Sequence, residues 1–92
     1  MPGNVEKLIS IRKRLEFTQH EMATQLGMSL RAYHSLETGE SAVRDIHILA
    51  AERVALINAV LKENPMLAGP DVRSDALDLA ALIREGRLEA RG

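Results

Sequence analysis

The chain has 92 residues, of which 46% are hydrophobic and 2% aromatic, and it contains no cysteine. This length fits one small domain with one core, and the lack of cysteine excludes disulfides and thiolate metal sites. The net charge of −1 argues weakly against a nucleic-acid partner, although a neutral module binds nucleic acid when its positive charges share one face. No apolar run reaches the ~20 residues of a membrane span, and the first four residues lack the apolar stretch of a secretory signal. We therefore expect a soluble cytoplasmic protein with a single domain over residues 1–92, without a membrane partner or a cofactor.

Helix-forming residue types dominate the sequence, and apolar residues recur at helical spacing. We therefore expect an all-α fold of five helices. The first runs from about Asn4 to Leu15, with Asn4 as its N-cap. Its apolar stripe contains Val5, Leu8, Ile9 and Leu15.

The second helix has the best-defined start in the sequence. Thr18 and Glu21 match a capping box, in which the hydroxyl and the carboxylate each accept a hydrogen bond from a free backbone amide. The helix ends at Leu26, and Gly27 supplies the left-handed residue that turns the chain. Ser29 caps a third helix, which extends to about residue 37. So short a turn makes the two helices cross steeply, as they do in a helix-turn-helix.

Two further helices follow the first 39 residues. Asp45 is the expected cap of the fourth, which reaches about Glu63 and stops before Pro65. The fifth runs from about Asp71 to Arg84, and Gly86 ends it. The expected apolar face of the fourth helix is Ile46, Leu49, Ala50, Val54, Ile57, Val60 and Leu61, and that of the fifth includes Val72, Ala76, Leu79, Ala80 and Ile83.

The stretch from Arg12 to Gly39 resembles the Cro/C1-type (XRE-like) helix-turn-helix family of phage and bacterial repressors. The similarity covers about residues 8–54 and includes Thr-Gln at 18–19, alanine at 23, glycine at 27 and Glu-x-Gly at 37–39. The sequence departs from the family at Glu16, where glycine is common. The resemblance implies a five-helix lambda-repressor-like domain, with a helix-turn-helix core over residues 4–39 and additional helices over residues 45–85.

The resemblance also implies roles for individual residues. Arg12 and Glu37 would form a partly buried ion pair between the first helix and the end of the third. Arg31 is the expected base reader, because a guanidinium can bond guanine O6 and N7 together. The other residues expected to contact DNA are Ser29, Leu30, His34 and Ser35 on the third helix, Gln19 at the start of the second, and Arg14 and Arg44, which flank the motif.

Several of these residues also have plainer interpretations. His34 is either a DNA contact or a solvated surface histidine. Leu30 either touches a thymine methyl or packs on its neighbours at the helix start. Tyr33 fills the core with its hydroxyl near the DNA backbone, or else it offers a stacking surface to bases.

The apolar faces after residue 39 exceed what one small core can bury. We therefore expect a homodimer, which would place two recognition helices in grooves about 34 Å apart. Val60, Leu79 and Ile83 are the expected centre of the interface. The alternative is that the fifth helix completes the core of a single chain.

No enzyme motif is present, and His20, His34 and His47 lack the spacing of a metal-ligand pair. The expected function is that of a sequence-specific transcriptional regulator, a repressor or autoregulator that binds double-stranded DNA at an inverted repeat. An alternative of a different class is a protein-interaction module, such as an antitoxin or antiactivator. Its acidic second half would then face a basic protein partner, through Asp71, Asp75, Asp78, Glu85 and Glu89.

Overall fold

The computed structural model describes residues 3–86, and this part of the chain is all-α, with no β-strand. Glu89, one of the acidic residues considered above, lies outside the described residues. None of the described helices has the length and apolarity needed to cross a membrane. The elements are α1 (Asn4–Leu15), α2 (Gln19–Leu26), α3 (Leu30–Thr38), α4 (Asp45–Leu61), the 3-10 turn η1 (Pro65–Leu67) and α5 (Pro70–Arg84).

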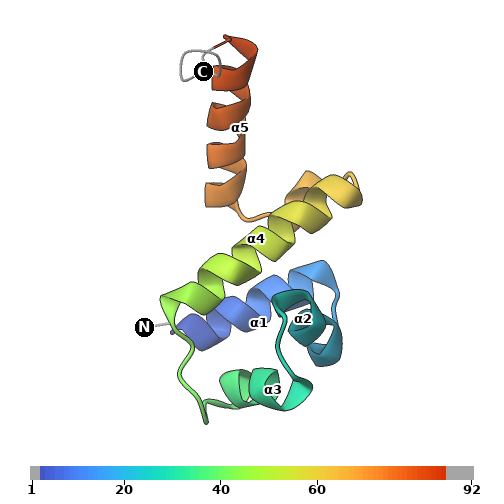
Figure 1. Ribbon diagram of the computed structural model, residues 1–92, viewed down its shortest axis with the longest axis vertical. Helices are drawn as coiled ribbons and strands as arrows, with labels where there is room; N and C mark the ends of the chain where they lie inside the picture. The colour runs from blue at the N-terminus through green and yellow to red at the C-terminus, as the bar shows by residue number, and fades with distance from the viewer. Residues whose placement is uncertain (1–2, 87–92) are drawn as a thin grey trace.

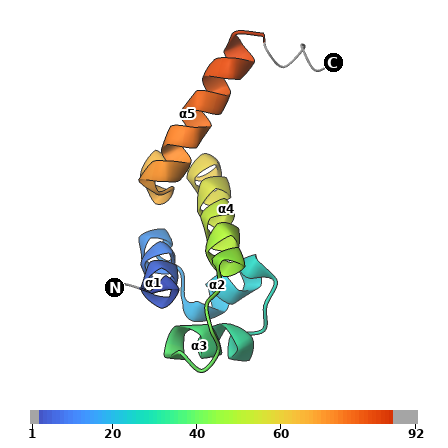
Figure 2. The ribbon, with the colours of Figure 1, turned by 90° about the vertical axis from the view of Figure 1, so that its left-hand side faces the viewer.

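The helices α1 to α4 pack into one body, and α5 stands away from it (Figures 1 and 2). α4 crosses the body diagonally and packs mainly on α1, whereas α2 packs mainly on α3. α3 lies at one end of the long axis of the molecule and α5 at the other (Figure 1). The face of α3 that points away from the body is therefore remote from α5.

One hydrophobic core holds α1 to α4 and η1 together. Leu8, Met22 and Tyr33 are its largest fully buried side chains. Ala23 is completely buried as well, and a larger side chain there would push the neighbouring helices apart. The remaining buried residues of the core are Ile11, Leu15, Leu36, Ile48, Ala51, Val54, Ala55, Ala59, Leu67 and Ala68.

The local signals around the second and third helices are confirmed. The amide of Glu21 donates to Thr18 Oγ1 (3.0 Å), and the amide of Thr18 donates to Glu21 Oε1 (2.8 Å), which completes the capping box. The hydroxyl of Ser29 accepts from the amide of Ala32 (3.1 Å) and caps α3. Gly27 ends α2 with a φ of 73°, in the left-handed region that favours glycine.

The expected caps Asn4 and Asp45 are wrong by one residue each. Gly3 and Arg44 occupy the N-cap positions, and Asn4 and Asp45 are the first residues of their helices. The side-chain amide of Asn4 instead donates to the carbonyl oxygen of Val43 (3.0 Å) and to Asp45 Oδ1 (3.2 Å). These two polar side chains therefore tie the starts of α1 and α4 together across 41 positions of sequence.

The predicted apolar face of α4 is also wrong. Only Val54 of that set is buried, together with Ile48, Ala51, Ala55, Asn58 and Ala59. α4 is apolar around most of its circumference, so its periodicity does not select one face. Alanines on the buried side let neighbouring helices approach closely. The predicted residues Ile46, Leu49, Ile57, Val60 and Leu61 are instead 40–73% exposed.

α5 contributes no buried side chain to this core. Its base is held where Arg73 Nη1 donates to the carbonyl oxygen of Ala68 (2.6 Å) and Val72 packs against the core. The radius of gyration, 15.2 Å, exceeds the ~12 Å of a compact chain of this length. The structure therefore contradicts the alternative in which the fifth helix completes the core of one chain.

Glu16 provides a test of backbone strain in this fold. It ends α1 with a φ of 60°, and its amide donates to the carbonyl oxygen of Lys13 (3.0 Å). A side chain with a Cβ is disfavoured in this left-handed conformation. We expect Glu16→Gly to raise the free energy of unfolding by about 1 kcal/mol in urea titrations.

Glu16→Ala is the matched control, because it removes the charge and keeps the Cβ. It should leave the free energy of unfolding within about 0.5 kcal/mol of the original. An equal gain in both variants would show that the charge of Glu16, and not its backbone conformation, sets the stability.

Candidate nucleic-acid interface

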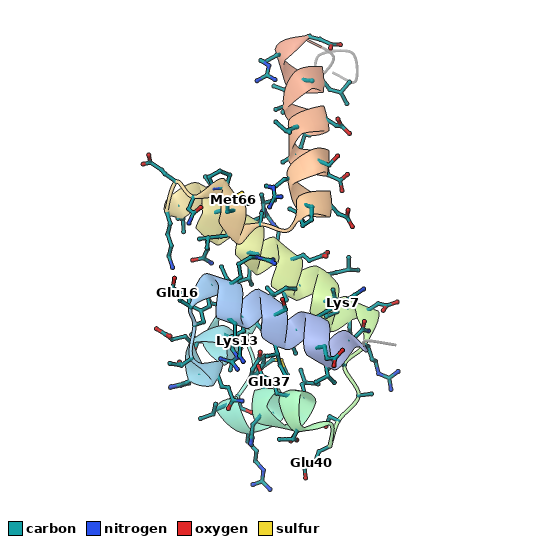
Figure 3. All side chains as sticks on the ribbon, turned by 180° about the vertical axis from the view of Figure 1, so that it is seen from behind. Lys7, Lys13, Glu16, Glu37, Glu40 and Met66 are labelled. Carbon is teal, nitrogen blue, oxygen red and sulfur yellow. The ribbon has the colours of Figure 1, made fainter. Side chains whose placement is uncertain are left out.

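The carboxylate of Glu37 joins three helices. Arg12 on α1 donates to it through Nε (2.7 Å to Oε2) and Nη2 (3.0 Å to Oε1). Gln19 on α2 donates through Nε2 (2.9 Å to Oε1), and the hydroxyl of Tyr33 on α3 donates to Oε2. Arg12 Nη1 also donates to the carbonyl oxygen of Phe17 (3.0 Å). Figure 3 shows Glu37 between α1 and α3, and these bonds fix how α3 sits on the other two helices.

The predicted ion pair between Arg12 and Glu37 is thus present, and it is shielded from solvent. The side chains are 15% and 4% exposed, respectively. Burial alone would raise the pKa of Glu37, but the hydrogen bonds from Arg12, Tyr33 and Gln19 together lower it below its ordinary value. Burial and the bond to Glu37 raise the pKa of Tyr33, which therefore stays a neutral donor.

An exposed face of α3 lies at the end of the molecule opposite α5. A shallow depression on it runs from the start of α2 along α3 and onto the residue after Gly39. The structure brings together there five of the eight residues predicted to contact DNA, and Leu30 among them is 45% exposed. We call this the α3 face; its lining residues are Gln19, Leu30, Arg31, His34, Ser35 and Glu40.

Ser29 stands beside this face and is exposed, at the start of α3. Its hydroxyl oxygen is already an acceptor in the helix cap. The hydroxyl hydrogen can still be donated to an acceptor on a ligand.

Arg14 and Arg44 do not line the α3 face. Arg14 Nε donates to the carbonyl oxygen of Leu67 (2.9 Å), which directs this side chain toward η1. Arg44 is exposed at the N-cap of α4, where its backbone amide donates to His47 Nδ1 (2.9 Å). Arg14 therefore makes a contact within the fold, and Arg44 lies outside the α3 face.

The three residues predicted at a dimer interface are 50–70% exposed but do not all line the same groove. Leu79 and Ile83 line a groove between α4 and α5, together with Leu56. Val60 lines a second groove at the base of α5, with Leu77. The two grooves meet at Leu56 and Ala76, which line both of them.

Glu40 is the member of the α3 face that the sequence did not indicate. Its carboxylate oxygen Oε1 accepts from the hydroxyl of Ser35 (3.2 Å), and its amide donates to Thr38 Oγ1 (3.4 Å). Figure 3 shows Glu40 beyond the body of the molecule, next to α3. The only signal in the sequence is its place directly after Gly39, which turns the chain back beside α3 with a φ of 88°.

Comparisons of the chain with protein-family models, curated proteins and solved structures give no match. Within residues 3–86, no group of three or more histidine, aspartate or glutamate side chains is arranged to hold a metal ion. The side chains of the α3 face define the chemistry that is open to it. They offer amide, hydroxyl, imidazole and guanidinium groups beside an exposed leucine, and one carboxylate.

The Glu37 network predicts an acid-sensitive contribution to stability. Because the pKa of Glu37 is lowered in the folded chain, its contribution is complete above the pKa of an unfolded glutamate, about 4.3. It is lost as the pH falls through the folded pKa. Glu37→Gln leaves the shielded Arg12 guanidinium without a counter-charge and should cost about 3 kcal/mol of unfolding free energy at pH 7. Urea titrations should show this difference shrinking as the pH is lowered below about 4.

Glu40→Gln is the control, since Glu40 is an exposed glutamate three residues away. Its unfolding free energy should stay within about 0.5 kcal/mol of the original. A Glu37→Gln variant as stable as this control would contradict the role given to the network.

Proposed function

We propose that this chain is a sequence-specific DNA-binding regulator of the Cro/C1-type helix-turn-helix class, with a lambda-repressor-like arrangement of its helices. It binds double-stranded DNA as a homodimer and acts as a repressor or autoregulator. One observation carries the proposal. Five residues expected from the resemblance to face DNA line a single exposed face of α3 and α2, and that face is held in place by Glu37.

In this proposal α3 enters the major groove, whose width of about 12 Å admits an α-helix. Arg31 reads a base edge, and the exposed Leu30 meets a thymine methyl group. Gln19 keeps one N–H on Glu37 and offers its carbonyl oxygen and its second N–H hydrogen to DNA. The first-turn amides of α2 and α3 favour a phosphate nearby.

The charges of the α3 face explain why one copy would bind weakly. Among residues 3–86, Arg31 is the only lysine or arginine that lines it, and Glu40 is an anion on the same face. Binding then depends less on phosphate neutralisation than in strongly basic proteins. Two copies that read two half-sites would supply the missing affinity and specificity.

The exposed apolar residues of α4 and α5 support the homodimer. Leu49, Ile57 and Val60 on α4 and Leu77, Leu79, Leu82 and Ile83 on α5 are 40–70% exposed. So large an apolar surface on a small protein indicates an interaction site.

Footprinting with the full chain tests the proposal, because an autoregulator binds DNA upstream of its own coding sequence. At moderate salt we expect protection of a two-fold symmetric site there. If no segment of that DNA is protected at micromolar protein, autoregulation is contradicted.

Arg31→Ala tests the base-reading residue. Loss of a bidentate contact should weaken binding to the preferred site by about 1–3 kcal/mol and relax the preference at one base pair of each half-site. Fluorescence anisotropy with the preferred site and its single-base variants measures both effects. Lys7→Ala is the control, since Lys7 lies on α1 beside α4 and the start of α5. An Arg31→Ala variant with unchanged affinity and base preference would remove Arg31 as a base reader.

Glu40→Gln tests the carboxylate on the same face. Removing a negative charge close to the phosphates should strengthen binding to DNA of unrelated sequence by about 1 kcal/mol. The ratio of specific to non-specific affinity should fall, as measured by competition at constant salt. Weaker binding to both kinds of DNA would instead mean that Glu40 contributes no repulsion and supports the fold of the α3 face.

A further inference from the structure

The side of α5 that faces the α4–α5 groove is mainly apolar, and Asp75 is the charged α5 residue at its border. Val72, Ala76, Leu79, Ala80 and Ile83 recur at three- and four-residue steps and line that groove above Leu56 of α4. None of these five side chains is buried. A 15-residue helix without tertiary packing is marginally stable in water, so this side of α5 needs a partner surface.

A second copy of this chain can supply that surface in two ways. With a two-fold axis along α5, two α5 helices run parallel. With the axis across α5, they run antiparallel. The molecule is 46 Å long and at most 26 Å across, and α5 lies roughly along the long axis with α3 at the far end (Figures 1 and 2). Parallel pairing therefore leaves both α3 helices on one side of the dimer, whereas antiparallel pairing sends them to opposite ends.

The charged residues beside the apolar side of α5 favour parallel over antiparallel pairing. At 3.6 residues per turn, Asp75 borders it on one flank, with Asp78 further round the helix, and Arg73 and Arg84 border it on the other flank. In agreement, Asp75 lines the α4–α5 groove, whereas Arg73 lines the second groove, at the base of α5. A two-fold axis along the helices sets the acidic flank of each copy against the basic flank of the other. A two-fold axis across them sets acid against acid and base against base, which is unfavourable.

We propose that two copies pair through parallel α5 helices, with Ala76, Leu79 and Ile83 at the seam and the two-fold axis along α5. Both α3 faces then point the same way, as binding to one face of a DNA duplex requires. The inference rests on the proposed function for the position of α3. The charge pattern of α5 supports it independently.

The absence of cysteine from the chain allows a direct test by single cysteines in the full-length protein. In a parallel pair each seam residue faces its own counterpart at every height along the helix. Ala76→Cys and Ile83→Cys, about 10 Å apart along α5, should therefore each form a disulfide-linked dimer under mild oxidation at low micromolar concentration. Ser74→Cys, on the opposite side of α5, is the matched control and should remain at least tenfold less linked.

An equimolar mixture of the Ala76→Cys and Ile83→Cys proteins, distinguished by a mass tag, completes the test. Links mainly between unlike variants would show antiparallel pairing and overturn the proposal. Failure of both variants to link, or equal linking of Ser74→Cys, would overturn it as well. The readout contains no DNA, so the parallel pair can stand even if footprinting fails, and footprinting can succeed even if the pair is antiparallel.

Discussion

The carboxylate of Glu37 fixes how α1, α2 and α3 pack on one another. One group, almost shielded from solvent, accepts hydrogen bonds from Arg12 on α1, Gln19 on α2 and Tyr33 on α3. A shielded carboxylate is costly unless it is paired and fully hydrogen-bonded, and the observed arrangement of the three helices meets both conditions. The same bonds hold Gln19 at the edge of the α3 face. The network that orders the core therefore also sets the geometry of the surface that we propose for DNA.

The two ends of the molecule have separate proposed roles: α5 pairs with a second copy, and α3 binds DNA. The core closes over α1 to α4 and η1 without any buried side chain from α5. The apolar side of α5 is consequently available to a second copy of the chain. Flanks of opposite charge border this side. At the other end, α3 displays polar groups with little net charge. The α3 face carries little charge, and the apolar side of α5 is uncovered. Both features fit a dimer, in which two α3 faces together supply the affinity and specificity that one lacks.

Local chemistry explains which features could be predicted from the sequence. The box formed by Thr18 and Glu21, the cap at Ser29 and the turn at Gly27 each depend on residues within a few positions of one another. The pair formed by Arg12 and Glu37 spans 25 positions, and only the resemblance to a known family indicated it. Asn4 and Asp45 could not be assigned correctly, because their bond depends on how α1 and α4 pack. The buried side of α4 was unpredictable for a related reason, since apolar residues surround that helix and alanines form the buried contact. Glu40 joins the α3 face through the turn after α3, which no periodicity indicates.

Selection of binding sites from random double-stranded DNA with the full-length chain tests the proposed DNA binding without any assumption about the target sequence. We expect an enriched inverted repeat whose half-site centres lie about 34 Å, or one helical turn, apart. Failure to enrich any sequence over the starting pool at moderate salt would contradict the assignment of the α3 face to DNA.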